Sequence, residues 1–88
     1  MNDLIMIEYK FDTQLLIAGN DLNDVEIRKY FEENFDGDST LIVGTDDLIK
    51  VHFHTNTPWE ILKYCATLGE IFDVVIENME RQARGEQG

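Results

Sequence analysis

The sequence has one cysteine, one proline and few basic side chains among its 88 residues. A single cysteine, Cys65, excludes an intrachain disulfide and any zinc site built from several cysteines. Seven lysines and arginines stand against 18 acidic residues, which gives a net charge of −11. Such a charge repels phosphate groups and anionic lipid head groups, so we expect neither nucleic acid nor a membrane surface as a partner.

Long apolar runs are also missing. No run approaches the roughly 20 residues that a membrane-spanning helix needs, and no secretory signal pattern is present. Together with the lone cysteine, this predicts a cytoplasmic location. An apolar fraction of 43% is typical of a folded domain, and the length allows one. We expect residues 1–6 to precede the fold, residues 7–79 to form the domain, and residues 80–88 to be a polar tail or linker.

Strand-like and helix-like patterns alternate along the chain. Two helix starts are predicted: Asn23 as an N-cap with Glu26 three residues on, and Thr57 as an N-cap followed by Pro58. Apolar residues at helical spacing follow each start. Alternating or short apolar runs bounded by turn residues predict the strands, at residues 7–18, 40–43, 48–54 and 71–76.

This order of elements is typical of one architecture. Strand, helix, strand, strand, helix, strand is the ferredoxin-like β-α-β-β-α-β pattern of an α+β domain. It predicts a four-stranded antiparallel sheet with both helices on one face and with the first and third strands as central neighbours. The open face of those two strands would then carry one set of polar residues, namely Lys10, Asp12, Gln14, Lys50, His52 and His54.

His52 and His54 are the only histidines of the chain. They share one face of the predicted strand because successive strand side chains point to opposite faces. Asp12 would lie about 4.8 Å away, on the neighbouring strand. Two imidazole nitrogens and one carboxylate oxygen suit zinc with a fourth position open, and manganese or iron(II) also accept this set. The pair of histidines alone is a weak signal, because a solvated polar face gives the same pattern.

Several segments together resemble a known family. They are Gly37-Asp38-Ser39, Lys50-Val51-His52-Phe53-His54-Thr55-Asn56 with Pro58, Gly69-Glu70, and Ile76-Glu77-Asn78-Met79 with Gln82. From about Tyr9 to Gln82 the chain resembles the middle domain of bacterial dihydroxyacetone-kinase-like proteins. This family is best known for the large subunit of fatty acid kinase.

The resemblance implies a parent protein of three domains that phosphorylates fatty acids to acyl phosphates. An N-terminal domain would bind ATP and magnesium, and a C-terminal domain would engage a partner subunit that carries the acyl chain. The middle domain would be a structural and regulatory link that forms a homodimer or contacts the other domains. No segment resembles the nucleotide-binding domain, so we expect this domain alone not to be an enzyme.

The resemblance also implies a zinc site, held by a cysteine on the first strand and by both histidines. The histidines match His52 and His54, but Asp12 stands at the cysteine position and Gln14 at a usual glutamate. Oxygen in place of sulfur weakens a zinc site and favours harder ions. We therefore expect a metal site of Asp12, His52 and His54 in a non-catalytic module. The alternatives are a metal-free dimerisation or docking domain that uses the open sheet face, and a small metal-dependent hydrolase.

Overall fold

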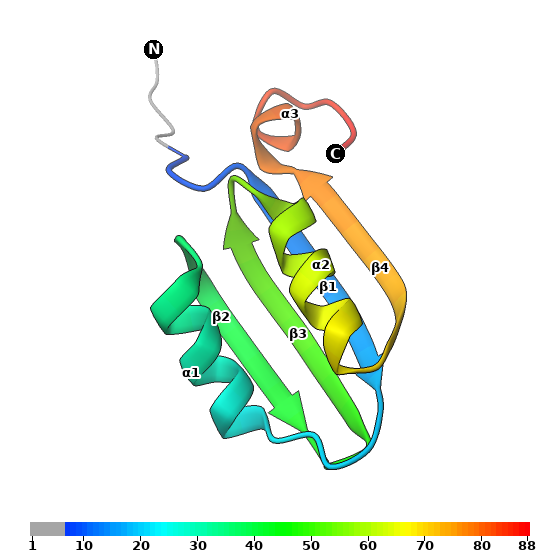
Figure 1. Ribbon diagram of the computed structural model, residues 1–88. Coiled ribbons are helices and arrows are strands. Elements are labelled where there is room, and N and C mark those ends of the chain that lie inside the picture. Colours follow the sequence, from blue (N-terminus) through cyan, green and yellow to red (C-terminus); the bar gives the residue numbers. More distant parts are fainter. Residues whose placement is uncertain (1–6) are drawn as a thin grey trace.

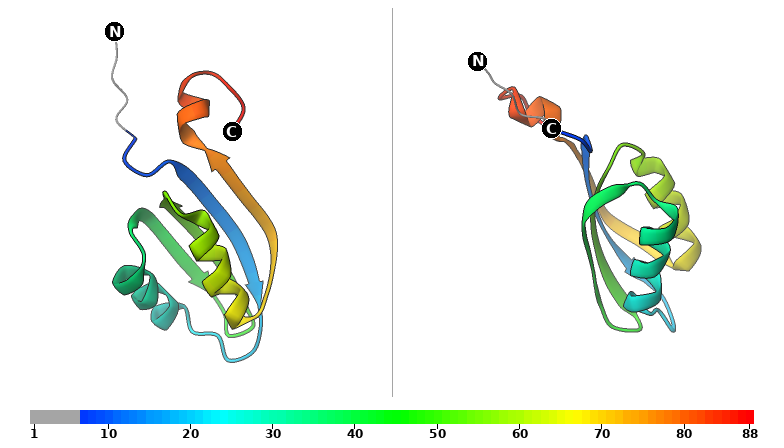
Figure 2. Two further views of the ribbon diagram at one scale, coloured as in Figure 1. Left: turned by 45° about the horizontal axis from the view of Figure 1, so that its top comes forward. Right: turned by 90° about the vertical axis from the view of Figure 1, so that its left-hand side faces the viewer.

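The computed structural model describes residues 7–88, so the expected leading segment, residues 1–6, lies outside the described residues. One four-stranded sheet has the order β2-β3-β1-β4, and every neighbouring pair of strands is antiparallel (Figure 1). Both long helices cover the same face of this sheet, which the edge-on view in Figure 2 shows directly. The prediction of a ferredoxin-like α+β fold is thus confirmed. The elements are β1 (Phe11–Ala18), α1 (Asp24–Asn34), β2 (Gly37–Gly44), β3 (Leu48–Thr55), α2 (Pro58–Leu68), β4 (Glu70–Asn78) and α3 (Met79–Ala83).

The core lies between the sheet and the two long helices. Strand residues alternate between the buried face and the open face, while helix residues three or four apart point toward the sheet. Cys65 is part of this core and fully buried, and burial raises the pKa of its thiol to about 12. The buried apolar residues are Leu15, Ile17, Ile27, Phe31, Ile42, Ile49, Val51, Phe53, Ile61 and Cys65.

The two helix starts differ from each other. Asn23 caps α1 as predicted, because its side chain accepts a hydrogen bond from the Glu26 amide at 3.0 Å. Thr57 makes no such bond at the start of α2, so the prediction of a side-chain cap there is wrong. The Thr57 hydroxyl instead lies 3.4 Å from the hydroxyl of buried Thr55. Pro58 is the first residue of α2, as predicted.

Two strand boundaries also differ from the sequence analysis. β1 begins at Phe11 rather than at Ile7, and β2 begins at Gly37 rather than at Thr40. β2 is longer than its apolar run because pairing with β3 continues past an irregularity and back to Gly37. This extension brings Asp38 into the sheet.

The C-terminal residues begin with a short helix and then fold back. The Asn78 side chain caps α3 by accepting from the Arg81 amide at 3.0 Å. The Asn78 amide donates to the Gly88 carbonyl at 3.2 Å, so the chain end returns to the end of β4. In Figure 1 α3 lies beyond the end of the sheet. Among residues 7–88, no helix is both long enough and apolar enough to cross a membrane.

Candidate metal centre

Strand pairing places the three predicted ligands together. β1 and β3 are antiparallel neighbours in which Asp12 pairs with His54 and Gln14 pairs with His52. All four residues have the parity of the open face, since the intervening Thr13 and Phe53 are buried beneath the helices. The site is therefore a product of the β1–β3 register, because a shift of one residue would move Asp12 to the other face.

Three ligand atoms of this group form a small triangle. His52 Nε2 and His54 Nε2 are 3.1 Å apart, and Asp12 Oδ1 lies 3.4 Å from the first and 3.8 Å from the second. Ligand atoms about 2.0–2.2 Å from a tetrahedral zinc ion lie about 3.3–3.6 Å from one another. The triangle matches that spacing closely, so the residues fit a zinc-sized ion with little movement.

The candidate ligands are partly buried and open toward one side. Their side chains are 17% exposed for Asp12, 27% for His52 and 23% for His54. The protein supplies three donor atoms, which leaves further coordination positions on the open face of the sheet. A bound zinc ion at such a site acts as a Lewis acid and lowers the pKa of a bound water.

Two neighbouring polar residues contact the candidate ligands. The Gln14 amide nitrogen lies 3.4 Å from both carboxylate oxygens of Asp12, on the same face of β1. Asp38 on β2 places Oδ1 3.7 Å from His54 Nδ1, the ring nitrogen that does not face Asp12. Sequence analysis had assigned Asp38 to a turn. The strand pairing of Asp38 with His54, which only the folded sheet creates, was the missing signal.

The two lysines predicted on this face do not join the cluster. Lys10 precedes β1, lies 3.9 Å from Glu80 and stands over the Phe11 ring at 5.3 Å. Lys50 is exposed two residues before His52, where it pairs with Leu16 of β1. The candidate ligands are therefore next to acidic and apolar neighbours rather than to a lysine clamp.

Apolar side chains surround the cluster on the open face. Leu41 pairs with His52 from β2, and Val75 pairs with Gln14 from β4. These two side chains are 47% and 46% exposed. Further apolar residues at open-face register positions are Leu16, Val43, Leu48 and Phe72. The open face is consequently a polar centre with an apolar surround.

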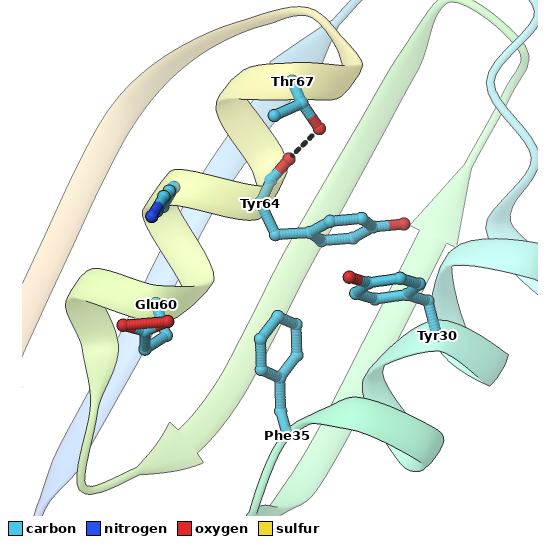
Figure 3. Close-up of a pocket in the computed structure, with 6 residues that line it drawn as sticks. Tyr30, Phe35, Glu60, Tyr64 and Thr67 are labelled. Atoms are coloured by element: carbon cyan, nitrogen blue, oxygen red, sulfur yellow. Dashed lines mark hydrogen bonds between the residues drawn. The ribbon is translucent and has the colours of Figure 1, made fainter.

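A separate cavity of about 380 Å³ lies on the helical side, between α1 and α2. The rings of Tyr30 and Tyr64 stack there with centroids 3.9 Å apart, and the Phe35 ring lies beside them (Figure 3). Partial burial raises the pKa of Tyr64. Glu60 and Lys63 from α2 complete much of the lining. This cavity is on the opposite face of the sheet from Asp12, so it is not part of the candidate metal centre.

Comparison with known proteins assigns the family. Residues 8–86 match the FakA-like middle domain of fatty acid kinases. The chain belongs to this family. An uncharacterized protein of Staphylococcus haemolyticus is 34% identical over 85 residues, or 89% of this chain. Protein YloV of Bacillus subtilis is 33% identical over 82 residues, or 86% of this chain. The chain spans 14% of the length of each of these two relatives.

Proposed function

We propose that this FakA-like middle domain holds a divalent metal ion through Asp12, His52 and His54. The observation that carries the proposal is the triangle of 3.1, 3.4 and 3.8 Å between their ligand atoms. These atoms come from two adjacent strands of one sheet, a rigid support that fixes their separation. Zinc fits the spacing, while the carboxylate in place of a thiolate also favours manganese or iron(II).

In this proposal the domain is a non-catalytic link within a fatty-acid-kinase-type protein. The family match supports that context, because it identifies the middle domain of FakA-like proteins. ATP and magnesium would bind to a different domain of the parent, and an acyl-carrying protein would be an indirect partner. The contribution of this chain is the folded scaffold, the metal site and the open sheet face, which together would join neighbouring domains or a second copy.

Metal content tests the proposal directly. Untagged protein is exchanged into metal-free buffer, loaded with zinc, manganese or iron(II), and analysed by mass spectrometry beside Asp12→Ala and His52→Ala variants. We expect about one ion per chain in the parent and a loss in both variants. Asp46→Ala removes an equivalent charge from the exposed turn between β2 and β3 and serves as the matched control. Absence of all three ions from the parent would overturn the metal site.

A second candidate function is metal-free docking through the open sheet face. The apolar surround favours it, because Leu41, Phe72 and Val75 are 47%, 37% and 46% exposed on one sheet face. Contiguous exposed apolar side chains are typical of protein interfaces. The occupant in this case is a second copy, measured as a dimer by analytical ultracentrifugation. Val75→Asp should give a monomer at the same concentration, whereas Val25→Asp on the outer face of α1 should not.

A further inference from the structure

Asp38 lies beside His54 but on the far side of its ring from the other candidate ligands. The two residues are direct partners across the β2–β3 pair. Asp38 Oδ1 is 3.7 Å from His54 Nδ1, whereas His54 Nε2 faces His52 and Asp12. Asp38 therefore approaches the nitrogen that would not meet the ion. It is placed to act on the ligand rather than to be one.

An irregularity in β2 puts Asp38 on this face. Leu41 pairs with His52 and Asp38 pairs with His54, so three residues of β2 span two residues of β3. Regular alternation counted back from Leu41 would place Asp38 on the helix-covered face. Ser39 absorbs the extra residue with a φ of 55°, a left-handed conformation that is uncommon for residues other than glycine. β-bulges of this kind re-aim side chains and are frequent next to functional sites.

Gly37 is a second local requirement for this arrangement. A Cβ added there would collide with the His54 carbonyl oxygen and with the Phe53 ring. Any larger residue would push β2 away from β3 at the point where Asp38 pairs with His54. The local sequence Gly-Asp-Ser thus provides close approach, the carboxylate and the bulge in consecutive positions.

We propose that Asp38 is a positioning residue that holds a hydrogen on His54 Nδ1 and so leaves Nε2 as the acceptor for the ion. This inference rests on the proposed metal site. Metal-bound histidines usually donate their second ring N–H to a carboxylate or carbonyl, which fixes the tautomer and the ring orientation. The 3.7 Å separation is longer than a hydrogen bond. The Asp38 side chain is 58% exposed and has room to close that distance.

The proposal has a consequence in the metal-free protein. Nε2 of His52 and Nε2 of His54 are 3.1 Å apart, so one of them must donate a hydrogen bond to the other. If His54 carries its hydrogen on Nδ1, His52 has to carry one on Nε2. The two neutral histidines would therefore hold opposite tautomers, with Asp38 determining which ring is the acceptor.

Nuclear magnetic resonance of protein with ¹⁵N-labelled histidine tests this without a metal. At a pH where both rings are neutral, we expect the Nδ1–H form for His54 and the Nε2–H form for His52. Asp38→Ala should move His54 toward the Nε2–H form. Asp46→Ala, with the same loss of charge at the opposite end of the hairpin, should not. An unchanged His54 tautomer in Asp38→Ala would overturn the positioning role.

Metal affinity supplies the second measurement. Loss of such a carboxylate partner typically weakens metal binding by about 10–100-fold. We expect that loss in Asp38→Ala by zinc competition titration, and a smaller one in Asp38→Asn, which keeps an acceptor oxygen. Equal zinc affinity in the parent and in Asp38→Ala would contradict the inference. A parent that binds no ion would instead overturn the proposed function, while the tautomer measurement would still decide the role of Asp38.

Discussion

Zinc should raise the melting temperature of this domain, and removal of the His52 ring should abolish most of the increase. The three ligand atoms already stand at tetrahedral spacing, so the folded state offers a site that the unfolded chain lacks. An ion at 100 times its dissociation constant stabilises the folded state by about 2.7 kcal/mol. In a domain of this size each kcal/mol raises the melting temperature by roughly 4–8 °C, so a rise of about 10–20 °C is expected.

His52→Ala leaves two ligand atoms 3.8 Å apart, those of Asp12 and His54. A site weakened a hundredfold would be half occupied at the same zinc concentration and would stabilise the fold by only about 0.4 kcal/mol. The corresponding rise in melting temperature is roughly 2–3 °C.

Differential scanning calorimetry of untagged protein, with and without zinc, measures both numbers. Asp46→Ala controls for a change at an exposed acidic position and should respond to zinc as the parent does. An equal rise in the parent and in His52→Ala would refute the reasoning, because the stabilising ion would then be bound elsewhere.

Three further predictions follow from individual residues. Asp12→Cys should raise the affinity for zinc relative to manganese, because thiolate is the softer ligand; an unchanged ratio in competition titrations would argue against Asp12 as a ligand. Asn23→Ala should cost about 1 kcal/mol in thermal unfolding through loss of its 3.0 Å cap, and Thr57→Ala should cost less, since Thr57 makes no such bond. The domain should lose stability as the pH rises from 9 toward 12, because the pKa of buried Cys65 is raised from 9.0 to about 12 and the unfolded chain releases that proton first. Chemical denaturation across this pH range should show a shallower loss for Cys65→Ala, and an identical slope would count against the burial argument.

Local chemistry in the sequence determined much of the fold. Alternation around His52 and His54 assigned both rings to one strand face, since the period of a strand is two residues. Asn23 with Glu26 marked one helix start, and Pro58 marked the other, because these residues satisfy or tolerate the unpaired amides of a first turn. The order of the elements then specified the ferredoxin-like topology and made Asp12 a neighbour of the histidines.

Tertiary structure decided what depends on register and on neighbouring strands. The pairing of Asp12 with His54 sets the ligand distances, and no local pattern fixes such a register to a fraction of an ångström. The bulge at Ser39 turns Asp38 toward His54, although the sequence around it is typical of a turn. Thr57 likewise lies near the hydroxyl of Thr55 and does not cap α2. The sequence thus determined which side chains share a face, while contacts between distant segments determined which of their atoms meet.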